Sequence, residues 1–190
     1  LPIVDKPVIQ YLGEEAVEAG IEEIIIVTGR GKRAIEDHFD YSYELEKTLV
    51  ERGKRDLLRQ VRHIAEMARF IYVRQPEPLG DGHAILCAKE VVGREPFAVM
   101  FGDDLVEGGS KPALSQLIDV YNEKQAPVIA LTKIEKADSK KYAMIKALTS
   151  QGRLHEIAAL IEKPDPAKAP SNLGIIGKYI ITPDVMDALE

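Results

Sequence analysis

The feature that most constrains the fold is the four-residue apolar run IIIV, from Ile24 to Val27. This run is too short and too apolar for anything but a buried strand. A helical spacing of apolar residues precedes it, from Pro7 to Ala19, and a short helical pattern that ends near Phe39 follows it. A buried strand between two helices indicates a fold in which helices pack on a sheet.

The same alternation of strand and helix continues through the first two thirds of the chain. It predicts an α/β fold of the Rossmann-like kind, with a mixed but mostly parallel sheet that is flanked by helices and joined by right-handed crossovers. The last third is richer in strand patterns and predicts a mixed extension of that sheet. The further strands are expected at residues 70–73, 97–101 and 127–134, and the further helices at 43–69, with a break at Gly53, and at 81–92 and 112–124.

Length and composition narrow the class of protein. A chain of 190 residues, 45% of them hydrophobic, is expected to form one domain, residues 1–190, with a sizeable core. The net charge of -6, without a basic block, argues against nucleic acid as a partner. Apolar runs far shorter than the ~20 residues of a membrane helix argue against a membrane partner. The single cysteine, Cys87, lies among apolar neighbours and predicts an inert core thiol in a reducing, cytoplasmic compartment.

The stretch VRQPEPLGDGHAIL, from Val73 to Leu86, joins a strand to a helix through a loop that holds two prolines and two glycines. Loops of this kind at the end of a strand are the commonest way in which α/β proteins present a small-molecule site. The sequence therefore predicts that this loop faces a ligand.

Two adjacent carboxylates, Asp103 and Asp104, follow the strand at 97–101 through Gly102. Open α/β sheets bind ligands at the carboxyl ends of their strands, and carboxylate oxygens suit Mg²⁺ that is shared with substrate phosphates. An aspartate pair that caps the following loop explains the same residues equally well. Both interpretations stay open from these residues alone.

A second charged pair, Glu162 and Lys163, ends a strand pattern at Pro164. A carboxylate accepts hydrogen bonds from paired sugar hydroxyls, and a neighbouring ammonium on the opposite side of an extended chain reaches a phosphate. Charges at strand ends are more often merely solvated, and the residues alone favour that interpretation.

Other chemistries find little support. The segment VTGRGKRAI has neither the G-x-x-x-x-G-K-[ST] nor the G-x-G-x-x-G spacing of phosphate-binding loops. No G-x-S-x-G motif is present, and the histidines lack a zinc-binding spacing. These four histidines are His38, His63, His83 and His155.

Several longer stretches together resemble one enzyme family. In chain order the clearest are LPIVDKPVIQY, YVRQPEPLGDGHAILCAKEVVG, EPFAVMFGDDLV and IEKPDPAKAPSNLGIIGKYIITPDV. They closely resemble the bacterial UTP:glucose-1-phosphate uridylyltransferases, or UDP-glucose pyrophosphorylases, over nearly the whole chain. The resemblance implies a fold of the nucleotide-diphospho-sugar transferase type.

The resemblance also implies a reaction and its residues. In the family, the phosphate of glucose 1-phosphate attacks the α-phosphorus of UTP, and UDP-glucose and pyrophosphate form with the help of Mg²⁺. Gln75 and the backbone of Gly80 match the positions that read uracil. Asp103 matches the catalytic metal ligand, Glu162 the residue that binds glucose hydroxyls, and Lys163 the catalytic residue that contacts the phosphates. Family members form dimers or tetramers, so a homo-oligomer is expected.

Three departures from the family pattern qualify these expectations. The family's Gly-rich G-x-G-T-R loop and catalytic lysine match no part of the chain after Leu1, and its second metal-binding aspartate would follow Glu190. We therefore expect a piece of a longer polypeptide, inactive by itself. The sugar-site motif Y-G-V reads Tyr142-Ala143-Met144 here, which places Ala143 at the substrate. Two alternatives remain: the same chemistry with dTTP or another sugar 1-phosphate, and a non-catalytic regulatory relative that binds nucleotide sugar.

Overall fold

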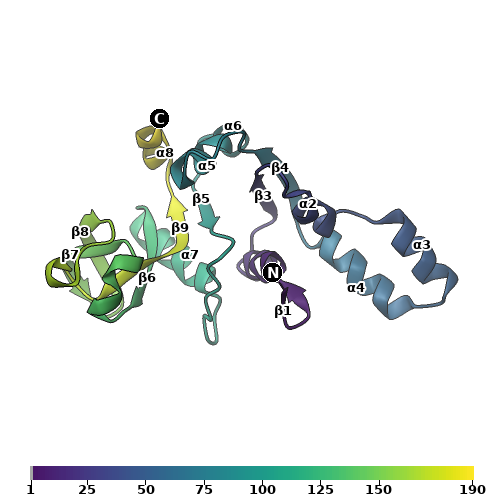
Figure 1. Cartoon of the computed structure of the whole chain (residues 1–190), viewed down its shortest axis with the longest axis horizontal. Helices are drawn as coiled ribbons and strands as arrows, with labels where there is room; N and C mark the ends of the chain where they lie inside the picture. Colours follow the sequence, from purple (N-terminus) through teal and green to yellow (C-terminus); the bar gives the residue numbers. More distant parts are fainter. Residues whose placement is uncertain (1) are drawn as a thin grey trace.

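The computed structural model describes residues 2–190 and shows helices packed around strands that form three separate sheets, two of them two-stranded and one five-stranded (Figure 1). No helix within that range combines the length and the apolar character that crossing a bilayer requires. In chain order the elements are β1 (Pro2–Ile3), β2 (Lys6–Pro7), α1 (Val8–Glu18), β3 (Glu23–Thr28), α2 (Arg33–Phe39), α3 (Tyr43–Glu51), α4 (Arg55–Glu66), β4 (Arg69–Arg74), α5 (Asp81–Cys87), α6 (Lys89–Val92), β5 (Phe97–Met100), α7 (Ala113–Lys124), β6 (Val128–Lys133), the 3-10 helix η1 (Lys136–Lys141), β7 (Met144–Gln151), β8 (Leu154–Ile161), the 3-10 helix η2 (Pro166–Lys168), β9 (Leu173–Ile181) and α8 (Pro183–Leu189).

Most of the expected elements are confirmed. The apolar run IIIV forms the centre of β3, and α1 begins directly after Pro7, whose extended backbone precedes the helix. The expected break at Gly53 is confirmed, because this residue has a φ of +65° and separates α3 from α4. The two helices form a pair that projects from the rest of the molecule (Figure 1). The helix expected at 81–92 is instead divided into α5 and α6 at Ala88, which ends one helix and begins the next.

The expected dominance of parallel pairing is wrong within residues 2–190. There β3 and β4 form a parallel pair, whereas the five-stranded sheet joins β5 and β6 to opposite sides of β9 in antiparallel register, and β7 pairs antiparallel with β8 and β9. The physical reason is the hairpin between β7 and β8, which reverses the chain: β8 and β9 both run antiparallel to β7, so β9 enters the sheet opposite in direction to β5 and β6. The α/β class and the mixed sheet are confirmed.

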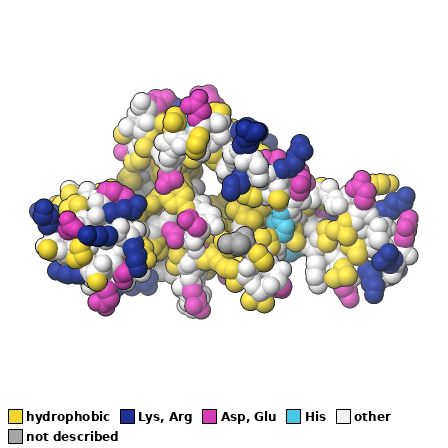
Figure 2. Space-filling model, in the orientation of Figure 1, with side chains coloured by type: hydrophobic (Ala, Val, Ile, Leu, Met, Phe, Trp, Pro, Cys, Tyr) yellow, Lys and Arg dark blue, Asp and Glu magenta, His cyan; other side chains and the backbone are white. Residues whose placement is uncertain are grey.

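An apolar groove lies between the β3–β4 pair and the five-stranded sheet. Among the described residues β3 pairs only with β4, and β5 pairs only with β9. A cavity of about 590 Å³ extends along residues 23–27, in β3, and along residues 97–102, in and just after β5. Figure 2 shows hydrophobic side chains gathered in the middle of the drawn face of the molecule, in this region. The groove extends to Gly102, next to the aspartate pair.

The core that supports the five-stranded sheet is formed by α1 and α7 against β6 and β9. A charged pair crosses it: the Lys178 ammonium is fully buried and donates to Glu15 Oε2 at 2.8 Å. The other oxygen of Glu15 accepts from the backbone N–H of Leu114 at 3.0 Å, so one carboxylate links three elements. Cys87, which was expected in the core, is instead half-buried. It belongs to α5, a helix without any fully buried residue. The fully or nearly buried residues of the cluster are Ala16, Leu114, Leu117, Ala130 and Ile180.

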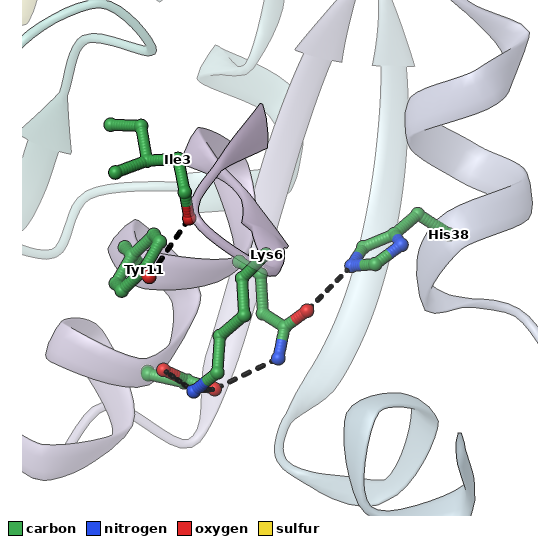
Figure 3. Close-up of polar contacts among 6 residues, drawn as sticks. Ile3, Lys6, Tyr11 and His38 are labelled. Atoms are coloured by element: carbon green, nitrogen blue, oxygen red, sulfur yellow. Dashed lines mark hydrogen bonds and ion pairs between the residues drawn. The ribbon is translucent and has the colours of Figure 1, made fainter. Parts of the chain in front are cut away.

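A polar network ties α1 to its surroundings on the other side (Figure 3). Lys6 Nζ donates to both carboxylate oxygens of Glu14, and Gln10 Nε2 donates to the same carboxylate at 2.9 Å. The nitrogen of the Gln10 amide therefore faces Glu14, and its oxygen accepts from His38 Nε2 at 3.1 Å. Burial lowers the pKa of His38, which stabilises the neutral imidazole in this position.

Candidate functional site

The loop after β4 is organised around the side chain of Gln75. The backbone N–H of Gln75 donates to Thr28 O at 2.8 Å and so continues the β3–β4 ladder by one residue. Its side-chain Nε2 donates to Gly80 O at 3.1 Å and contacts His83 Nδ1 at 3.1 Å. Gly80 has a φ of +101°, a conformation that glycine adopts without strain. The sequence singled out Gln75 and Gly80, and the structure brings them into direct contact.

The two aspartates after β5 have different environments. Asp104 Oδ2 accepts a hydrogen bond of 2.6 Å from the backbone N–H of Gly177 in β9. Asp103 is exposed, and within residues 2–190 its carboxylate has no hydrogen-bond or ion-pair partner. Asp104 therefore matches the loop-capping interpretation, and Asp103 is the carboxylate that remains available to a ligand.

The residues around Asp103 fit Mg²⁺ only if substrate phosphates supply the other ligands. No group of three or more His, Cys, Asp or Glu side chains that could hold a metal occurs within residues 2–190. Mg²⁺ in phosphoryl-transfer sites is commonly held by one or two carboxylates together with substrate phosphates. One free carboxylate is compatible with that arrangement.

Ala143, Glu162 and Lys163 flank the paired ends of the neighbouring strands β7 and β8. Met144 pairs with Ile161 at the ends of β7 and β8, so Ala143 and Glu162 follow on directly from a paired position. The Lys163 ammonium lies 3.3 Å from Glu162 Oε1, and both side chains are exposed.

The backbone at this strand end is strained. Lys163 has a φ of +41°, which a residue with a side chain rarely adopts. The fully buried Ser139 hydroxyl donates to Pro164 O at 2.7 Å and holds the chain immediately after it. Strain that is held by its surroundings is common at ligand sites.

Tyr179, which the sequence did not single out, lies next to the residue that leads from β5 into the aspartate loop. It is half-buried in β9, and its ring packs edge-on against Phe101 at a centroid distance of 5.4 Å. Burial raises the pKa of Tyr179, and the negative charges of Asp81, Asp104 and Glu162 raise it further. These three carboxylates belong to the first turn of α5, the loop after β5 and the residue directly after β8 respectively. The charges of these segments thus act on one side chain, whereas no hydrogen bond within residues 2–190 joins Gln75 to Asp103 or Glu162.

Comparison with known proteins agrees with this geometry. The family model described as "Nucleotidyl transferase" matches residues 1–190. The UTP–glucose-1-phosphate uridylyltransferase of Bacillus subtilis is 51% identical over 190 residues, which are the whole of this chain and 65% of that protein. The chain thus spans slightly less than two thirds of the length of this curated relative.

Solved structures give the same result. A UDP-glucose pyrophosphorylase complexed with UDP-glucose superposes with a TM-score of 0.88 at 43% identity, covering 100% of this chain and 69% of the other. The UTP-bound enzyme from Acinetobacter baumannii superposes with a TM-score of 0.92 at 43% identity, covering 97% of this chain and 66% of the other. Because the family model matches from end to end, the chain belongs to the nucleotidyl transferase family.

Proposed function

We propose that the complete protein transfers a uridylyl group from UTP to glucose 1-phosphate. A phosphate oxygen of glucose 1-phosphate forms a bond to the α-phosphorus of UTP, the bond from that phosphorus to the β-phosphate bridging oxygen breaks, and UDP-glucose and pyrophosphate are released. The nucleophile is already an anion, so the reaction needs positioning and charge stabilisation rather than a general base. The observation that supports this proposal most is the exposed Asp103 carboxylate, which lacks a partner within residues 2–190 and matches the family's metal position, in a chain that the nucleotidyl transferase model matches from end to end.

Each proposed role follows from the chemistry of the group. Gln75 and the backbone of Gly80 present an acceptor and a donor to the uracil edge. Glu162 accepts from glucose hydroxyls, and Lys163 places a positive charge near the phosphates. Ala143, beside Glu162, lines the sugar position.

Asp103 is the proposed ligand for Mg²⁺, together with substrate phosphates. The ion would neutralise phosphate charge as the transfer proceeds. Asp103 itself contributes a fixed, exposed carboxylate at the end of a strand, next to the loop that Asp104 holds in place.

Release of pyrophosphate by the complete polypeptide, with UTP, glucose 1-phosphate and Mg²⁺, tests the proposal. Asp103→Asn should lower kcat/KM by at least about a hundredfold, since it removes a charge that acts on the transferring phosphate. Asp119→Asn, an exposed aspartate on α7, is the matched control and should leave turnover unchanged. Full activity of Asp103→Asn would contradict the assignment of the metal ligand.

Ala143 favours a second candidate, a non-catalytic relative that binds nucleotide sugar and regulates an enzyme. A methyl group at a position where the family has glycine narrows the approach of the sugar. Calorimetric binding of UDP-glucose without any pyrophosphate release would support this candidate. Turnover with UTP would exclude it, and competition between UTP and dTTP would establish which nucleotide is preferred.

We further infer that the complete protein works in the cytoplasm as a homo-oligomer, as the resemblance to its family implies. Light scattering of the purified complete polypeptide tests the oligomeric state, and a monomer at micromolar concentration would contradict it.

A further inference from the structure

The orientation of the Gln75 amide is determined by a neighbour that can only accept. A carbonyl oxygen has no proton to donate, so the amide atom that lies 3.1 Å from Gly80 O must be the nitrogen. The same nitrogen lies 3.1 Å from His83 Nδ1. Because the nitrogen carries two protons and no lone pair for hydrogen bonding, His83 Nδ1 must accept the second one, and the imidazole proton is on Nε2.

Both donors of the amide are therefore used inside the loop. Gly80 O takes one proton and His83 Nδ1 takes the other, and the amide oxygen has no partner within residues 2–190. Gln75 is half-buried at the base of the loop, where its backbone is held by Thr28. The side chain thus presents an acceptor, and no donor, to whatever the loop faces.

We propose that His83 strengthens the base specificity of this site by holding the Gln75 amide, together with Gly80 O, with its oxygen toward the nucleotide. This inference rests on the proposed uracil-reading role of Gln75. Uracil has a donor, N3–H, at the position where cytosine has an unprotonated N3 acceptor. An amide oxygen that accepts from uracil would face the lone pair of cytosine, and an unpaired acceptor in a half-buried site is unfavourable.

Without the acceptor on His83, one amide proton of Gln75 loses its partner inside the loop. Gly80 O alone then holds the nitrogen, so the rotation that offers this nitrogen to the base costs one hydrogen bond less, and the rotated amide suits cytosine better than uracil. Thymine shares the hydrogen-bonding edge of uracil, so His83 has no influence on the choice between UTP and dTTP. His83 is a positioning residue, because it acts through Gln75 rather than on the nucleotide.

Dissociation constants of UTP, CTP and dTTP, measured by calorimetry on the complete polypeptide, test the inference without the need for turnover. His83→Ala should lower the preference for UTP over CTP by about tenfold, the value of one hydrogen bond in a site of this kind. His83→Asn should restore it, because the asparagine oxygen can accept in place of Nδ1. His155→Ala, a half-buried histidine of β8 that contacts Ser150, is the matched control and should change no preference.

The outcomes separate this inference from the proposed function. A UTP-to-CTP preference that is the same in His83→Ala as in the unmodified protein would overturn the inference, as would an equal change in the UTP-to-dTTP preference. A preference lost in His83→Ala and regained in His83→Asn would support it, even if the complete protein released no pyrophosphate. Absence of pyrophosphate release would overturn the proposed function alone.

Discussion

Asp104 and Gly177, which are distant in sequence, are joined by a hydrogen bond of 2.6 Å from the glycine N–H to the aspartate Oδ2. This bond fastens the loop after β5 to the middle of β9, next to the contact in which Phe101 N donates to Gly177 O at 2.8 Å. It separates two adjacent carboxylates into one that holds the loop and one, Asp103, that remains exposed.

Replacement of Asp104 tests this division of roles, in which Asp104 stabilises the loop and Asp103 does not. Asp104→Ala leaves the Gly177 N–H without its acceptor and should lower the free energy of unfolding by about 1–3 kcal/mol. Asp104→Asn retains an oxygen that can accept and should lose about 1 kcal/mol or less. Asp103→Asn should leave stability unchanged, since the exposed carboxylate has no partner in the described chain. Urea denaturation measures all three, and equal stability of Asp104→Ala and Asp103→Asn would contradict the division.

Gly177 should tolerate no larger residue. A Cβ at this position would lie 2.6 Å from Phe101 Cδ2 and 2.7 Å from Asp104 Oδ2, both closer than van der Waals contact. We expect Gly177→Ala to lower the free energy of unfolding by about 1–3 kcal/mol, as overpacking usually does. Gly29→Ala is the matched control, because a Cβ there would have nothing within 4 Å. Thermal unfolding that shifts no more for Gly177→Ala than for Gly29→Ala would count against this prediction.

The buried pair of Lys178 and Glu15 should show strong coupling. Lys178→Met leaves the carboxylate without its counter-charge in a largely buried position and should cost about 3–5 kcal/mol. The double variant Lys178→Met with Glu15→Gln should be less unstable than the sum of the two single changes. A double-mutant cycle in urea measures the coupling, and additive losses would show that the two charges do not stabilise one another.

His38 should make stability depend on pH. Burial holds its pKa below the usual 6.5, so the unfolded chain takes up a proton at a higher pH than the folded one. The contribution of the neutral imidazole is therefore present above pH 6.5 and is lost as the pH falls from there toward the lowered pKa. Urea unfolding between pH 5 and pH 8 measures this slope.

The control for that slope is a variant that cannot titrate. His38→Gln keeps a nitrogen that can donate to Gln10 and should show a smaller loss of stability on acidification than the unmodified chain. His155→Gln, on an exposed hairpin, should retain the full slope. Identical pH profiles for the unmodified chain and His38→Gln would show that His38 does not carry the effect.

Much of the fold follows from patterns that are local in the chain. The run at Ile24–Val27 and the turn at Gly53 predict a strand and a helix break because hydrophobic spacing and backbone preference act over a few residues. The loop around Gln75 and Gly80 is also identified locally, through its prolines and glycines after a strand. These predictions needed no knowledge of which segments meet.

Other features depend on contacts between distant segments. Nothing in the pattern LGIIGKYII reveals that β9 runs antiparallel between β5 and β6, since both faces of a central strand are apolar whatever its direction. Tyr179 looks like one more apolar residue of that strand, and His83 is one of four histidines without shared spacing.

The sequence alone therefore establishes the α/β class, most of the elements, and Gln75, Gly80, Asp103, Ala143, Glu162 and Lys163 as candidate site residues. The folded chain adds what depends on neighbours in space: Asp104 holds the loop, Asp103 has no partner among the described residues, and the charges of carboxylates from three segments raise the pKa of Tyr179. The physical reason is that side-chain periodicity reports which face of an element is buried, whereas a hydrogen bond or a field of charges requires partners that the fold alone brings within a few ångströms.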